Sequence, residues 1–141
     1  MSYKWLKKGG GEFVGFAISM FFLTSILITI IGAVILQDSL QYLNMVNQQL
    51  ARDVIVCEDI DDAQETAEKN AKEYFKYKKS ISDVKVDVFY TPGSEEKWKK
   101  GNYITVFVSV KVKSISPFTS GRYTSMVITM LERTERNEWG L

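Results

Sequence analysis

The sequence predicts an α+β protein with a long N-terminal transmembrane helix, a helical stem that continues it, and a small head. In the head, one helix packs on an antiparallel sheet of three or more strands. Two observations predict this class. The run 13–36 has no charged residue. Beyond it, apolar residues recur first at helical spacing and then with a period of two. A chain of 141 residues has room for one modest domain beside such a span.

The uncharged run is long enough to cross a bilayer. At ~1.5 Å per residue it forms a helix roughly 36 Å long, which exceeds a hydrocarbon core of ~30 Å. A cleaved secretory signal has an apolar region of only ~7–15 residues and a small-x-small exit, which this run lacks. We therefore expect an uncleaved signal anchor in the cell (cytoplasmic) membrane.

The charges beside the run predict its orientation. Lys4, Lys7 and Lys8 precede it, whereas no Lys or Arg follows it until Arg52. The positive-inside rule then places residues 1–12 in the cytoplasm and the chain after residue 36 outside.

The segment 37–52 is predicted to be a helical stem. It lacks Gly and Pro, and its apolar residues are spaced by three and four: Leu40, Leu43, Val46 (or Asn47) and Leu50. The membrane helix is therefore expected to continue straight into the stem.

The head is expected over 53–132 and begins with a second helix. Ala63, Ala67, Ala71 and Phe75 recur every four residues, and the acidic segment 58–62 before them is typical of a first helical turn. A calcium site is the alternative interpretation of this acidic segment. The segment lacks the glycine and the distal glutamate of a calcium loop, so the helical interpretation is favoured.

Three strands follow, separated by turn residues. Alternation with a period of two is visible in Val84, Val86, Val88 and Tyr90, in Ile104, Val106, Val108, Val110 and Val112, and in Met126, Ile128 and Met130. The short loops favour antiparallel pairing. The valine face is expected to pack on the second helix. A polar tail is expected over 133–141.

The composition argues against an enzyme. The chain has no histidine and a single cysteine, Cys57, which excludes Cys/His zinc sites, histidine-based triads and intramolecular disulfides. No catalytic residue, metal ligand or cofactor is predicted. Cys57 is expected to be a small apolar residue, although it could form a disulfide between two copies.

A net charge of +1 gives no reason to expect nucleic acid as a partner. The segment 97–100 (KWKK) could be a basic, aromatic binding patch. Two neighbouring glutamates offset its charge, so a solvated loop with one packed tryptophan is favoured.

The stretch 7–16, KKGGGEFVGF, places basic residues, glycines and then Glu12-Phe13 at the start of the apolar run. With the stem and head behind it, this arrangement resembles the type IV pilin superfamily. More narrowly, it resembles the TadE-like pseudopilins of tight-adherence pilus systems and their Gram-positive relatives. The resemblance implies a structural subunit or accessory component of a pilus-like assembly, with its head outside the cell membrane or in a surface filament. It also implies pilin-like subunits, including other copies of this chain, or an inner-membrane platform as partners.

The resemblance also gives Glu12 a role. In pilin-like assemblies the carboxylate meets the α-amino group of a neighbouring subunit, after cleavage behind a glycine makes the glutamate the fifth residue. Counting back from Glu12, the residue before such a cut is Lys7. Cleavage after Gly9, Gly10 or Gly11 would leave Glu12 third, second or first. Processing in this region therefore stays open, and in an uncleaved chain Lys7 or Lys8 of a neighbour could pair with Glu12.

A stripe of small residues points to the same helix as an assembly device. Gly11, Gly15 and Ser19 recur every four residues, and Ser25, Thr29 and Ala33 repeat the spacing further along. Small side chains on one face let helices approach closely in lipid. The alternative function is a signal-anchored extracytoplasmic domain that binds a partner without polymerising, for which hydrophobicity of the helix would suffice.

Overall fold

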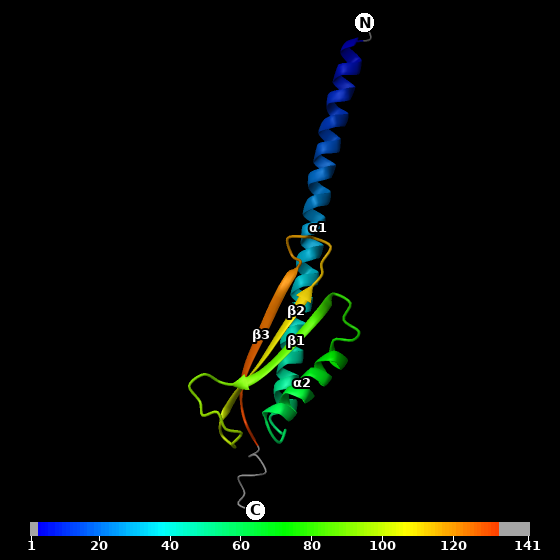
Figure 1. Ribbon diagram of the computed structural model, residues 1–141. Helices are drawn as coiled ribbons and strands as arrows, with labels where there is room; N and C mark the ends of the chain where they lie inside the picture. The colour runs from blue at the N-terminus through cyan, green and yellow to red at the C-terminus, as the bar shows by residue number, and fades with distance from the viewer. Residues whose placement is uncertain (1–2, 133–141) are drawn as a thin grey trace, which may run out of the picture.

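The computed structural model describes residues 3–132, and the side chains from residue 9 onward. The tail expected over 133–141 lies outside the described residues. The elements, in chain order, are helix α1 (Tyr3–Val54), helix α2 (Ile60–Tyr74) and strands β1 (Ile81–Tyr90), β2 (Tyr103–Val112) and β3 (Gly121–Met130). Figure 1 shows the head gathered around the C-terminal half of α1, while the N-terminal half projects from it alone.

Helix α1 is continuous from the predicted span into the predicted stem. It has 52 residues, which corresponds to roughly 78 Å of helix. No proline interrupts it. Of the residues predicted to form the stripe of the stem, Leu43, Val46, Asn47 and Leu50 are buried, whereas Leu40 is partly buried and packs against the core.

Helix α2 begins at a capping arrangement built from the acidic segment. The Asp59 side chain accepts a hydrogen bond from the backbone N–H of Asp62 (2.7 Å), and the Asp62 carboxylate accepts one from the N–H of Glu58 (3.0 Å). Such reciprocal caps satisfy N–H groups that have no partner within the helix. The predicted stripe of alanines, together with Phe75 just after the helix, is buried.

The three strands form one antiparallel sheet in the order β1-β2-β3. Val108 of the central strand lies opposite Val86 on one side and Ser125 on the other. The pairing of β1 with β2 shifts between Ser82 and Lys85, where Asp83 has a φ of 49°. The regular alternation of buried residues in β1 therefore starts at Val86 rather than at Val84, which is only half-buried.

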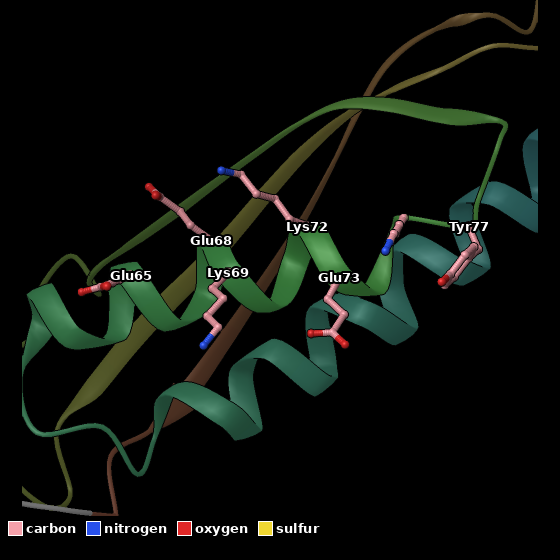
Figure 2. Close-up of a pocket in the computed structure, with 7 residues that line it drawn as sticks. Glu65, Glu68, Lys69, Lys72, Glu73 and Tyr77 are labelled. Carbon is pink, nitrogen blue, oxygen red and sulfur yellow. The ribbon is translucent and has the colours of Figure 1, made fainter.

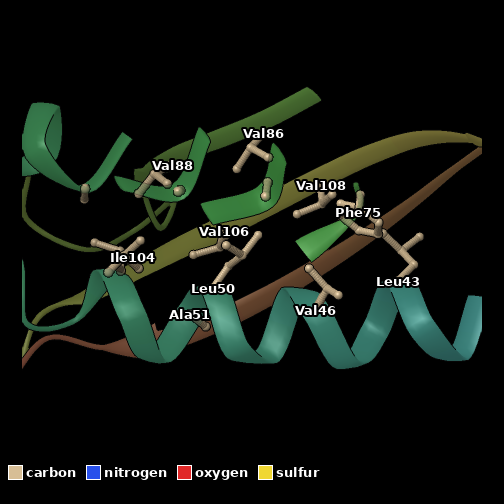
Figure 3. Packing of buried hydrophobic residues seen from close by; sticks show 14 of the residues in the cluster. Leu43, Val46, Leu50, Ala51, Phe75, Val86, Val88, Ile104, Val106 and Val108 are labelled. Carbon is tan, nitrogen blue, oxygen red and sulfur yellow. The ribbon is translucent and has the colours of Figure 1, made fainter. Parts of the chain in front are cut away.

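Both helices cover the valine face of the sheet. Helix α2 packs against β1, and α1 packs against β2 and β3. Figure 3 shows Leu43, Val46 and Leu50 of α1 directed at the sheet that carries Val106 and Val108. The core therefore reaches back into the stem, because the apolar stripe of α1 needs a partner as much as the sheet does.

A polar contact sets which face of β3 points inward. The Asn47 side chain donates hydrogen bonds to the Val106 carbonyl (3.3 Å) and to the Ser125 hydroxyl (3.1 Å). Ser125 in turn donates to the side-chain oxygen of Asn44 (2.8 Å). Ser125 therefore faces α1, and Met126 and its alternate neighbours face away from the core.

Candidate functional site

The N-terminal half of α1 is an apolar surface that nothing in the described chain covers. Every side chain from residue 9 to residue 31 is exposed. The large hydrophobic residues among them include Phe13, Phe16, Phe21, Phe22, Ile26 and Ile30. By length and composition this helix could cross a membrane, and almost none of its apolar stretch is buried in the head. Soluble monomers rarely leave such a contiguous apolar surface in water.

The polar side chains within this half are satisfied inside the helix. The hydroxyls of Ser19, Thr24, Ser25 and Thr29 each donate to the carbonyl four residues earlier, at 2.8–2.9 Å. A hydroxyl that bonds its own backbone can be surrounded by hydrocarbon without losing a hydrogen bond. The helix is therefore chemically compatible with a lipid environment along its full apolar length.

The predicted assembly residues lie at the beginning of this half. Glu12 is exposed, and a side chain added at Gly9, Gly10, Gly11 or Gly15 would meet no atom within 4 Å. Ser19 follows Gly15 one turn later on the same face and is linked to it by its hydroxyl bond (2.9 Å). The structure thus places Gly11, Gly15 and Ser19 on one open helix face. The role of these residues in assembly stays a prediction.

Cys57 lies in the turn between the two helices. Its side chain is 7% exposed, and its thiol lies 3.5 Å from the Asp53 carbonyl. Burial raises the pKa of the Cys57 thiol. A disulfide between two copies would therefore require this turn to open, because the reactive species is an accessible thiolate.

The acidic segment serves as the cap of α2 described above. Within residues 3–132, no group of three or more metal-ligating side chains comes together. The carboxylates of Asp59 and Asp62 are instead directed at backbone N–H groups.

Trp98 occupies the buried position expected for the one packed residue of its loop. It is almost completely buried, and its indole N–H donates to the Cys57 carbonyl (2.9 Å). The neighbouring lysines Lys97, Lys99 and Lys100 are exposed. The tryptophan therefore packs at the end of the core where α1 leads into the turn that carries Cys57.

Sequence reasoning missed a polar latch between α1 and α2. The Asp53 carboxylate accepts hydrogen bonds from Gln49 (3.1 Å), Asn70 (3.0 Å) and the Tyr74 hydroxyl (2.8 Å). The hydrogen bond to Asp53 raises the pKa of Tyr74, because it stabilises the protonated phenol. No local pattern indicates the contacts of Asp53 with Asn70 and Tyr74, which lie 17 and 21 residues away in the sequence.

Sequence reasoning also missed a second exposed apolar surface, on the outer face of the sheet. It is formed by five large side chains from all three strands: Phe89, Tyr103, Met126, Ile128 and Met130. Met126 alone is 61% exposed. The alternation of β3 was visible in the sequence, but the direction of each face was not.

One hollow on the head is lined mainly by charged side chains. Figure 2 shows this hollow on the outer face of α2, lined by Glu65, Glu68, Lys69, Lys72, Glu73 and Tyr77. Its carboxylates and ammonium groups alternate along the helix, as on an ordinary solvated face.

Comparison with known proteins gives no match: no family model, no curated protein and no solved structure is significantly similar to this chain. The arrangement defines an α+β head built on the C-terminal half of a long helix whose N-terminal half is apolar and bare.

Proposed function

We propose that this protein is a pseudopilin-like structural membrane protein, a subunit or accessory component of a tight-adherence or type IV pilus-like assembly. One observation carries the proposal: a single helix is both the spine of the head and an uncovered apolar rod. A rod that is rigidly joined to its head can transmit the packing of helices in the membrane to the spacing of heads outside. A flexible tether between anchor and domain could not do this.

Glu12 is the second support. A carboxylate at the edge of an apolar helix is unfavourable unless a cation or water meets it. In the proposed assembly its partner is a cation of a neighbouring subunit, either a chain N-terminus or Lys7 or Lys8. The open space beside Gly11 and Gly15 lets a neighbouring helix approach the same face.

The test is cross-linking of neighbouring chains in native membranes. Glu12→Ala removes the charge but makes the helix more hydrophobic, so insertion should be retained while cross-linked oligomers decrease. Glu12→Asp, which keeps the charge, should retain most of the oligomers. Gly15→Leu should also reduce them, because the bulky side chain separates the helices.

The matched control is Ala17→Leu, which adds a similar side chain about 200° around the helix. A signal-anchored domain that does not polymerise would show the same pattern for wild type and all four variants. That outcome, or the absence of oligomers in wild type, would overturn the assembly proposal and leave only the anchored head.

A further inference from the structure

The β2–β3 loop, residues 113–120, is the part of the head that reaches farthest toward the bare half of α1 (Figure 1). Its Ser114 hydroxyl donates to the Gly32 carbonyl (3.2 Å), and Ser116 is buried against the helix. A Cβ at Gly32 would lie only 2.8 Å from the Ser116 Cβ and 2.9 Å from the Thr119 hydroxyl oxygen. The loop therefore contacts α1 at the level of Gly32. A larger residue at this position would collide with Ser116 and Thr119.

That level coincides with a membrane boundary. If the hydrocarbon core begins at Phe13, the rise from Phe13 to Gly32 is about 28 Å, close to the ~30 Å thickness of the core. The loop is then level with the junction of hydrocarbon and headgroups on the side of the head. Beyond Gly32 the helix begins to be covered by the head: Ile35 and Leu36 are partly buried, although Val34 is still exposed.

The outward side of the loop is apolar. Phe118 is 88% exposed and Ile115 is 56% exposed. The polar groups of the loop are instead bonded within it: the Ser120 hydroxyl accepts from the Ser114 N–H (2.9 Å) and donates to the Ser116 carbonyl (3.0 Å). A loop with several internal hydrogen bonds and with an aromatic and aliphatic tip suits the interfacial layer of a bilayer.

Lysines lie near the base of the loop, where the Lys113 N–H donates to the Ser80 carbonyl (2.8 Å) and joins the loop to the turn after α2. Lys111, near the end of β2, and Lys113, the first residue of the loop, are exposed. Lys78 pairs with Asp38, six residues or about 9 Å beyond Gly32 along α1. Lys76 and Lys79 of the same turn are exposed. Amino groups at this height lie beside lipid phosphates, where each is attracted to an anionic surface.

We propose that the β2–β3 loop inserts Ile115 and Phe118 into the lipid interface and docks the head on the membrane, with these lysines on the headgroups. This proposal rests on the proposed membrane span. It adds a lipid-binding surface on the head, which fixes the height of the head above the bilayer and the direction in which α1 tilts.

The test uses spin labels on the full chain in vesicles that contain a phosphatidylcholine and phosphatidylglycerol mixture. A Cys57→Ala background removes the native thiol, and its fold is checked by circular dichroism. Single cysteines then replace Phe118 in the loop, Ile28 in the span and Lys97 at the far end of the head. Collision rates with oxygen, which enters lipid, and with a nickel chelate, which stays in water, report the depth of each label.

We expect labels at Phe118→Cys and Ile28→Cys to favour oxygen several-fold over the chelate, and the label at Lys97→Cys to show the reverse. A water-like label at Phe118→Cys beside a lipid-like one at Ile28→Cys would overturn the docked loop and leave the span intact. Low collision rates with both reagents at Phe118→Cys would indicate burial by protein and would also overturn it. A water-like label at Ile28→Cys would instead overturn the membrane span.

Discussion

Replacing Leu50 with alanine tests whether the stem of α1 is part of the head. The Leu50 side chain is 0% exposed and projects from α1 onto the valine face of the sheet (Figure 3). The change removes three carbons, which is worth about 2.4 kcal/mol in transfer free energy alone. The cavity left behind raises the expected loss of unfolding free energy to about 3–4 kcal/mol.

That loss is a large part of the ~5–15 kcal/mol by which a domain of this size is usually stable. At ~4–8 °C per kcal/mol, it should lower the midpoint of thermal unfolding by at least ~12 °C. The measurement is thermal unfolding of the full chain in mild detergent, followed by near-ultraviolet circular dichroism. This signal reports packing around aromatic residues such as Trp98 rather than helix content.

Met45→Ala is the matched control, because Met45 lies on the same helix but is 58% exposed. It should change the unfolding free energy by no more than ~0.5 kcal/mol. Equal midpoints for the two variants would refute the packing of α1 against the sheet, and with it the idea that one helix joins membrane and head rigidly.

Two further predictions concern the head. A fragment that begins at Gln37 should be soluble and fold. A fragment that begins at Asp53 should not fold, because it lacks the part of α1 that covers the valine face over β2 and β3. Cooperative urea unfolding of both fragments would contradict this prediction. The free energy of unfolding should also fall as pH rises above ~10. The pKa of Tyr74 is raised in the folded chain, so the unfolded chain loses its phenol proton at lower pH and is stabilised by that loss. The test is urea unfolding of the fragment that begins at Gln37, repeated across that pH range. Tyr74→Phe should reduce the fall of the unfolding free energy with pH, and Tyr77→Phe should not. The same pH dependence in both variants would exclude Tyr74 as the cause of the fall.

Much of the fold was predictable from local periodicity. The alanines of α2 repeat every four residues, the valines of β2 repeat every two, and the run 13–36 is uncharged over its whole length. Such patterns depend on neighbouring residues, so they are visible without knowledge of the rest of the chain.

What escaped prediction depends on contacts between distant residues. In β3 the residues that face away from the core are more apolar than Ser125, which faces inward because Asn47 and Asn44 bind it. The contact of the β2–β3 loop with Gly32 and the hydrogen bonds of Asp53 likewise join segments that are distant in the sequence. No local pattern in either segment predicts these contacts. The predicted assembly residues are exposed, and their role in assembly stays a prediction.

The small-residue face of α1 is tested most directly by disulfide cross-linking in native membranes. Gly15→Cys and Ala17→Cys, each in a Cys57→Ala background, place one thiol on that face or on the opposite one. After mild oxidation, Gly15→Cys should give a band at twice the mass of the chain, whereas Ala17→Cys should stay monomeric. Equal bands from both variants, or a band from Ala17→Cys alone, would contradict assembly through the face that carries Gly11, Gly15 and Ser19.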